Sequence, residues 1–320
     1  MLQLKSTSFF YICNLSLHYH SFFVLFFYLY CDTLKTTHIT SILEKGTFDT
    51  MNFFMPANAC NAHLHIIDPA FPNDGKAAAQ IGTIDTYRKL ADTIHLPRAV
   101  FVQAKPFGVD NSCLIDAIAK FGKDDARGIA VVAPTVSDME LERLHIAGVR
   151  GLRFSVWNPS NAVVSFDSCY PLSERCKQFG WNMQLHMSAK QLSGYADTIR
   201  KLDCRVVIDH MGRLDPTLGL KDPAYTFLLE MIDRGNTWIK LSGPYLNTLT
   251  GKPWNDATTI ANAIATYAPE RVVWGTDFPH VTEKVKPNEQ SLVDLIPLWL
   301  PTKHAQQLAL VDNPQELYGF

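Results

Sequence analysis

The feature that most constrains the fold is a regular alternation of short apolar runs with longer segments of helical period, from about residue 60 to the end of the chain. The runs are rich in Val, Ile and aromatic residues, and there are eight of them. Such alternation is typical of βα units around a parallel sheet. We therefore expect strands at 60–66, 99–103, 128–132, 149–154, 182–186, 206–208, 238–241 and 272–274.

The segments between these runs carry signals of helices. The clearest is the sequence SDME at 137–140, a capping box in which Ser137 and Glu140 would each satisfy a backbone amide near the other. It predicts a helix that continues to about Ala147 and stops at Gly148. We expect further helices at 86–94, 114–121, 172–179, 225–234, 257–267, 290–298 and 302–310. An open doubly wound sheet would show the same alternation, so periodicity leaves both folds open.

The placement of polar residues favours a barrel. In a (β/α)8 barrel all strands end at one mouth, where the catalytic groups of such enzymes lie. Here the polar residues at or just after the predicted strand ends are His63, His65, Arg153, His186, His210 and Asp277. We therefore predict an α/β fold, a single (β/α)8 TIM barrel formed by residues 51–320.

The first 50 residues differ from the rest. Their longest uninterrupted apolar run, 22–30, is shorter than the roughly 20 residues that span a bilayer. The stretch resembles a signal peptide but lacks a small-residue cleavage pattern. We interpret residues 1–50 as an N-terminal extension upstream of a true start at Met51, with a targeting segment as the alternative.

Charge and cysteine content narrow the class of protein. The chain has 29 basic and 31 acidic residues, a formal net charge of -2, so it lacks the basic surplus of a nucleic-acid or membrane-surface binder. Its seven cysteines form no C-x-x-C pair, which favours reduced thiols over a disulfide framework. We expect a cytoplasmic protein with a small-molecule partner. The sequence leaves the oligomeric state open.

The histidines and Asp277 can support two kinds of chemistry. His63 and His65 are two residues apart on a strand and would face the same side. Several imidazoles with one carboxylate suit a single divalent ion such as zinc, with an open position for water. Without metal, Asp277 would be the general base, and the histidines would donate hydrogen bonds to a developing oxyanion. Both alternatives predict hydrolysis at a carbonyl or carboxyl centre.

Further residues are candidates for substrate binding. Arg153 alternates with apolar neighbours, and an inward guanidinium there could hold a carboxylate in bidentate fashion. A structural ion pair is the alternative. Lys105, Arg213 and Tyr245 follow the second, sixth and seventh runs and could recognise oxyanions or hydroxyls at the rim.

Several motifs together resemble a known family. They are NAHLH at 61–65, GVRGLRF at 148–154, VIDHMG at 207–212, KLSG at 240–243, WGTDFPH at 274–280 and NPQELYGF at 313–320. From about residue 58 onward the chain resembles the amidohydrolase-related proteins, in the branch of the amidohydrolase superfamily that includes 2-pyrone-4,6-dicarboxylate lactonase and sugar lactonases.

The resemblance implies a barrel in which Asp277 activates water, three histidines (His63, His65 and His210) polarise a lactone carbonyl, and Arg153 contacts a carboxylate, without metal. The pyrone enzyme has additional arginines after its fourth and seventh strands, where this chain has SVWNP at 155–159 and PYLN at 244–247. This departure argues against a dicarboxylated pyrone as the substrate.

His186 is a second departure, because zinc-dependent decarboxylases and hydrolases of the wider superfamily carry a metal ligand there. With His63, His65 and Asp277 it would complete a metal site. We favour a lactonase-like hydrolase without a cofactor, with a zinc enzyme as the alternative and a non-catalytic barrel as a third hypothesis.

Overall fold

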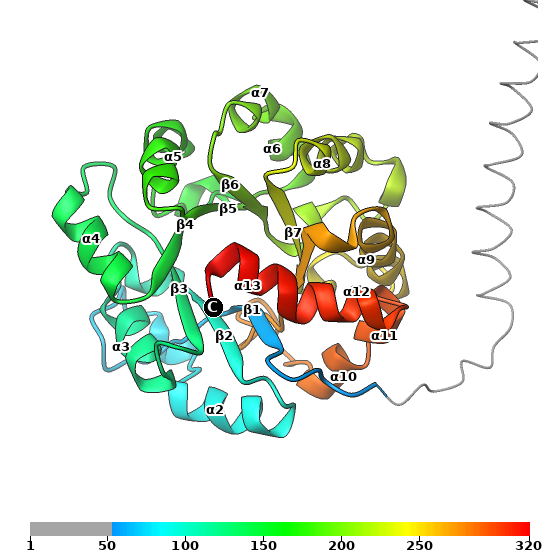
Figure 1. Cartoon of the computed structure of the whole chain (residues 1–320), viewed down its shortest axis with the longest axis horizontal. Helices are drawn as coiled ribbons and strands as arrows, with labels where there is room; N and C mark the ends of the chain where they lie inside the picture. Colours follow the sequence, from blue (N-terminus) through cyan, green and yellow to red (C-terminus); the bar gives the residue numbers. More distant parts are fainter. Residues whose placement is uncertain (1–52) are drawn as a thin grey trace, which may run out of the picture. The chain divides into compact units, whose positions relative to one another are not determined.

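A computed structural model of the chain describes residues 53–320, so the predicted extension, residues 1–50, lies outside the described residues. The strands form one parallel sheet in sequential order (Figure 1). They are β1 (Cys60–Leu64), β2 (Arg98–Val102), β3 (Ala126–Ala130), β4 (Val149–Ser155), β5 (Asn182–His186), β6 (Arg205–Ile208), β7 (Thr237–Leu241) and β8 (Val272–Trp274). The predicted α/β barrel is confirmed.

The last strand returns to the first, which excludes the doubly wound alternative. Leu64 forms a bridge with Phe278, and the Asp277 amide donates to the His63 carbonyl at 2.9 Å. Gly275 allows this close approach, because a Cβ atom there would lie 2.6 Å from the His63 amide nitrogen. The barrel is thus closed between β1 and β8, next to the polar residues His63 and Asp277 at their ends.

Helices surround the sheet, as Figure 1 shows. They are α2 (Ile84–Thr93), α3 (Ser112–Phe121), α4 (Asp138–Ile146), α5 (Cys169–Gln178), α6 (Ala189–Gly194), α7 (Ala196–Arg200), α8 (Pro223–Asp233), α9 (Asn255–Tyr267), α10 (Glu289–Val293), α11 (Ile296–Trp299), α12 (Lys303–Gln307) and α13 (Asn313–Tyr318). None of the helices within residues 53–320 has the length and apolar character needed to cross a membrane.

The helices depart from the predictions in several places, and α13 was not among the predicted helices. The short helices α6 and α7 were not predicted, although Ser188 and Gln191 form a complete capping box at the start of α6. The helix expected at 290–298 is divided into α10 and α11. At the start of α4, Ser137 accepts from the Glu140 amide as predicted, but the Glu140 carboxylate binds Arg143 instead of completing the box.

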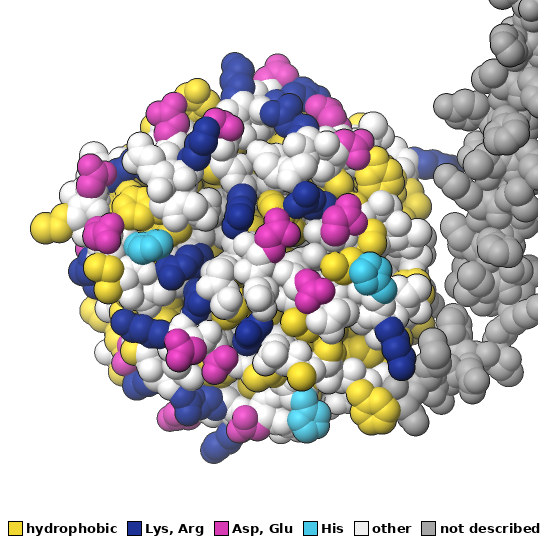
Figure 2. Space-filling view, in the orientation of Figure 1, with side chains coloured by type: hydrophobic (Ala, Val, Ile, Leu, Met, Phe, Trp, Pro, Cys, Tyr) yellow, Lys and Arg dark blue, Asp and Glu magenta, His cyan; other side chains and the backbone are white. Residues whose placement is uncertain are grey.

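The C-terminal segment closes the end of the barrel opposite the mouth. Helix α13 lies across the strands in Figure 1, and Leu317 and Tyr318 pack among the interior residues of the barrel. Arg127 donates hydrogen bonds to the backbone oxygens of Tyr318 and Gly319. On this face, basic and acidic side chains are interspersed (Figure 2).

The described cysteines agree with the expectation of reduced, buried thiols. All five within residues 53–320 are free and buried, namely Cys60, Cys113, Cys169, Cys176 and Cys204.

Candidate active site

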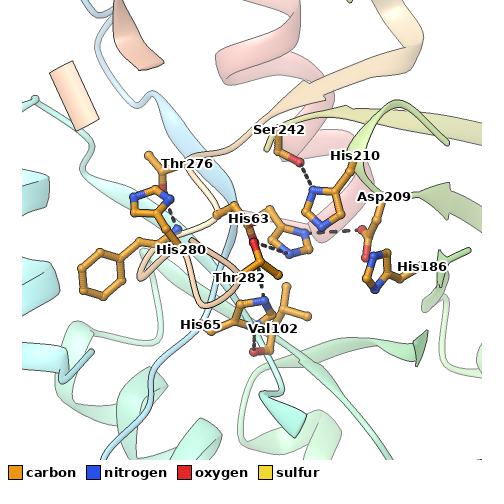
Figure 3. A network of polar contacts seen from close by, with 12 residues as sticks. His63, His65, Val102, His186, Asp209, His210, Ser242, Thr276, His280 and Thr282 are labelled. Atoms are coloured by element: carbon orange, nitrogen blue, oxygen red, sulfur yellow. Dashed lines mark hydrogen bonds and ion pairs between the residues drawn. The ribbon is translucent and has the colours of Figure 1, made fainter. Parts of the chain in front are cut away.

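The strand ends bring most of the predicted site residues to one pocket of about 960 Å³. Its lining includes His65, Lys105, Arg153, His186, His210, Arg213 and Asp277. His63 is fully buried, next to His65 and His210 (Figure 3). Tyr245 reaches Asp277 with its hydroxyl group. The structure thus places all nine predicted residues in or against a single site.

Asp277 follows β8 in a left-handed conformation, with φ of 64°. Its Oδ2 accepts a hydrogen bond from the Tyr245 hydroxyl at 2.8 Å. Its Oδ1 lies 3.5 Å from His63 Nε2 and 3.7 Å from His65 Nε2. Burial raises the pKa of Asp277 to about 6, and the Tyr245 hydrogen bond opposes part of this shift. Asp277 is therefore ionised at neutral pH but is a stronger base than an exposed aspartate.

The four histidines form a contiguous group around Asp277. Ring centroids lie 5.1 Å apart for His63 and His65, 4.7 Å for His63 and His210, and 5.2 Å for His186 and His210. Burial lowers the pKa of His65 to about 3, and it lowers the pKa values of the other three well below the usual range. All four are therefore neutral imidazoles at pH 7, each with one N–H donor and one acceptor nitrogen.

Hydrogen-bond partners determine which ring nitrogen of each imidazole carries the proton. His65 Nδ1 lies 2.8 Å from the Val102 carbonyl oxygen, which can only accept, so Nδ1 carries the proton and Nε2 is an acceptor. His186 and His210 each place Nδ1 2.9 Å from a serine hydroxyl, Ser155 and Ser242, respectively. When these hydroxyls donate, both Nε2 atoms become N–H donors.

Glycine at position 243 makes the His210 arrangement possible. Gly243 has φ of 57°, and a Cβ there would lie 3.1 Å from His210 Nδ1 and 2.8 Å from Leu246. Any larger residue would push His210 away from Ser242.

Buried charges lie next to the histidines, and two of the residues involved, Asp209 and Lys240, were not predicted. Asp209 pairs with Arg153 at 3.0 Å and with Lys240 at 3.5 Å, and all three side chains are buried. Burial alone would raise the pKa of Asp209, but the charges of Lys240 and Arg153 outweigh it and hold the pKa well below its usual range. The signal in the sequence is one acidic and one basic residue at inward positions of otherwise apolar strands, 206–209 and 238–241.

The predicted substrate-binding residues fall into two groups. Arg153 uses Nε to bind Asp209, and its other two guanidinium nitrogens have no hydrogen-bond partner among residues 53–320. Lys105 Nζ donates to Asn161 at 2.6 Å, and the Arg213 guanidinium stacks 4.6 Å over the Trp157 ring. These three cations belong to the pocket wall. We expected Tyr245 at the rim. Its hydroxyl group instead donates a hydrogen bond to Asp277 and lies 2.9 Å from His280 Nδ1.

A metal ion would find its closest set of donors at His63, His210 and Asp277, whose ligand atoms lie within 4.8 Å of one another. This set shares only His63 and Asp277 with the one expected from the sequence. A histidine that binds metal normally donates its other N–H to an acceptor. The partner 2.9 Å from His63 Nδ1 is the Lys240 ammonium, which cannot accept. The surroundings of His63 therefore do not fit a metal ligand.

Comparisons with known proteins agree with this architecture. The profile of a family described as Amidohydrolase matches residues 60–320. A 2-pyrone-4,6-dicarboxylate hydrolase of Comamonas testosteroni is 35% identical over 280 residues, covering 83% of this chain and 92% of the relative. A 4-sulfomuconolactone hydrolase of Rhizobium radiobacter is 30% identical over 282 residues, covering 84% and 92%.

A solved structure is similar throughout the barrel. It is that of a probable 2-pyrone-4,6-dicarboxylic acid hydrolase from Acinetobacter baumannii with citric acid bound. The two chains are 26% identical and superpose with a TM-score of 0.72, over 82% of this chain and 100% of the other.

Proposed function

This chain belongs to the amidohydrolase family, and on that premise we propose that it is a lactone hydrolase acting on the carboxylic ester bond of a small anionic lactone. The observation that carries the proposal is Asp277, a buried carboxylate with a raised pKa at the mouth of the barrel, facing imidazoles that can hold both water and a carbonyl oxygen.

Asp277 acts as the general base. Its Oδ1 and the acceptor nitrogen of His65 lie 3.7 Å apart, so a water molecule at the mouth can donate one hydrogen to each. Asp277 takes a proton as the water oxygen attacks the lactone carbonyl carbon. The Tyr245 hydrogen bond holds Oδ2 and leaves Oδ1 for this transfer.

His186 and His210 stabilise the charge that develops on the carbonyl oxygen. Their Nε2 atoms donate when Ser155 and Ser242 donate to Nδ1. When the tetrahedral intermediate collapses, the ring C–O bond breaks and the leaving alkoxide receives the proton from Asp277. The product is a ring-opened hydroxy acid, and Asp277 is again ionised.

An anionic substrate is supported by the cations of the pocket wall. Arg153 offers two free guanidinium nitrogens, and Lys105 and Arg213 lie in the same wall. The names of the two relatives describe a dicarboxylate and a sulfonated lactone, and the Acinetobacter structure holds citric acid. The segments 155–159 and 244–247 lack the additional arginines of the pyrone enzyme, so we assign the class of substrate and not the pyrone itself.

The proposal also includes the cellular setting and the absence of a cofactor. Five free, buried cysteines within residues 53–320 are consistent with a reducing, cytoplasmic compartment.

A zinc-dependent decarboxylase or hydrolase is the second candidate function, because the His63, His210 and Asp277 donor atoms lie close together. A non-catalytic barrel is the third.

A panel of lactones tests the proposal. Purified protein is incubated with carboxylated, sulfonated and neutral lactones and with a carboxylated phenol, and acid release and carbon dioxide release are followed separately. We expect faster acid release from anionic lactones than from neutral ones, with Asp277→Asn as the inactive control. Carbon dioxide release would favour the decarboxylase, and no turnover of any compound would favour the non-catalytic barrel.

A further inference from the structure

Lys240 is a fully buried lysine that the proposed reaction does not use directly. Its Nζ lies 2.7 Å from Gln184 Oε1, 2.9 Å from His63 Nδ1 and 3.5 Å from Asp209 Oδ1. An ammonium group has three N–H donors and no acceptor. Two of the three neighbours, Gln184 and His63, are hydrogen-bond partners, and Asp209 is an ion-pair contact.

The orientation of Gln184 supports this assignment. Its Nε2 faces Asn182 Oδ1 at 3.2 Å and the Tyr318 hydroxyl at 3.5 Å, so its carbonyl oxygen is turned toward Lys240. Burial lowers the pKa of Lys240 to about 8, although the charge of Asp209 opposes this shift. Gln184 Oε1 and the Asp209 carboxylate can only accept, so Lys240 faces both of them as the donor.

The ammonium determines which nitrogen of His63 is protonated. A neutral imidazole carries one proton, and His63 Nδ1 must be unprotonated to accept from Lys240. The proton is then on Nε2, which lies 3.5 Å from Asp277 Oδ1. We propose that Lys240 is a positioning residue that fixes the His63 proton on Nε2, the nitrogen that faces Asp277, and prevents His63 from acting as a metal ligand.

The Asp209 carboxylate could accept a hydrogen bond from the other tautomer of His63, in which Nδ1 carries the proton. Its Oδ1 lies 3.4 Å from His63 Nδ1 and 3.5 Å from Lys240 Nζ, and within residues 53–320 both are ion-pair contacts and not hydrogen bonds. Without Lys240, His63 would donate Nδ1–H to Asp209, and the lone pair on Nε2 would face His210 and Asp277. That is the arrangement in which metal-binding histidines are held by a carboxylate. Lys240 therefore separates a metal-free site from a metal site built from the same residues.

The native protein provides the first test, without a variant and without substrate. In protein labelled with ¹⁵N at histidine, two-bond nitrogen–proton correlations identify the protonated nitrogen of each ring, and a His63→Gln spectrum assigns the His63 signals. We expect His63 with a protonated Nε2 and an unprotonated Nδ1 at pH 7. The Nδ1–H tautomer in the native protein would overturn the proposal.

The second test uses Lys240→Met, which removes the donor but keeps an unbranched side chain. We expect the His63 proton to move to Nδ1 and the affinity for zinc, measured by titration calorimetry, to rise on the order of 10- to 100-fold. Lys105→Met is the matched control, because this lysine of the pocket wall donates to Asn161 and not to His63, and its loss should leave tautomer and zinc affinity unchanged.

The site of zinc binding is checked with the double variant Lys240→Met, Asp277→Asn, which should lose the gained affinity. A folded Lys240→Met protein with the native His63 tautomer, or with native zinc affinity, would overturn the proposal. Neither measurement uses catalysis, so failure of the lactonase assignment would leave this test intact.

Discussion

Asp277 combines burial with an ionisable carboxyl group, and its pKa sets the pH at which the enzyme works. A carboxyl group with a pKa of about 6 is protonated below that pH and can then no longer accept a proton from water. The buried histidines titrate at much lower pH and add no transition in this range. We therefore expect kcat/KM to fall about tenfold per pH unit below pH 6.

The matched variant for this prediction is Asp277→Asn. It should lower kcat by about 10²- to 10⁴-fold and remove the transition near pH 6. Because the folded pKa is raised, the ionised carboxylate opposes folding, and this cost appears as pH rises through 6. The asparagine variant should thus be at least as stable as the native protein at pH 8, as urea unfolding can measure. A stable variant with native activity would disprove the role of Asp277.

Arg153 has two functions in the structure, an ion pair and a place in the pocket wall. Replacement by lysine keeps a positive charge but removes the fork that holds Asp209 and a substrate carboxylate together. We expect Arg153→Lys to raise KM for carboxylated lactones at least tenfold more than for neutral analogues, with kcat measured alongside. Equal losses for both classes would mean that Arg153 serves only the Asp209 pair.

At the residue scale, the sequence predicted the location of polar side chains that stand at the end of an apolar strand, such as His63 and Asp277, whereas their catalytic roles stay a prediction. It missed Lys240, because a lysine within a strand resembles a solvated residue until the partners that neutralise it are known. Gln184 lies on β5 and Asp209 directly follows β6, so only the assembled barrel brings them to Lys240. The hydrogen on each imidazole likewise depends on partners distant in sequence, such as Val102 for His65.

Strands were predicted closely and helices less so. Strand β5 has the predicted bounds, whereas β3 begins two residues before the predicted range. Helices α6 and α7 are too short to show an amphipathic period, and only the capping signal of Ser188 and Gln191 indicates α6. Buried parallel strands give a strong apolar signal, which short surface helices lack.

The close contact between β1 and β8 depends on the glycine at position 275. A methyl group on residue 275 would lie 2.6 Å from the His63 amide nitrogen and force the two strands apart. We expect Gly275→Ala to lower the free energy of unfolding by about 1–3 kcal/mol or more and to reduce activity. Gly194→Ala is the control, because nothing lies within 4 Å of the position that its methyl group would take. Equal stabilities of the two variants would contradict this account of barrel closure.

The part of the chain that the structure describes was predictable as a barrel because eight strand signals and the polar strand ends agree with one another. Every strand and every proposed site residue lies between Cys60 and Trp274 or shortly after it, within the matched residues 60–320. We therefore expect a shortened protein that begins at Met51 to fold and to turn over lactones at the rate of the full chain. Its circular dichroism and specific activity measure this, and failure to fold would move the domain boundary upstream.

Metal dependence could not be decided from the sequence. The group of His63, His210 and Asp277 has donor atoms suited to zinc. The group next to His63 Nδ1, however, is the side-chain ammonium of Lys240 on β7. The balance between two mechanisms thus depends on one hydrogen bond across the barrel interior.

The most direct test of the account is the turnover of an anionic lactone by the enzyme before and after exhaustive chelation, with zinc content measured in both samples. If Asp277 activates water unaided, the chelated enzyme keeps its full rate, and added zinc gives no increase. Activity that disappears with the removal of stoichiometric zinc and returns when the ion is restored would contradict the account and establish the metal-dependent mechanism.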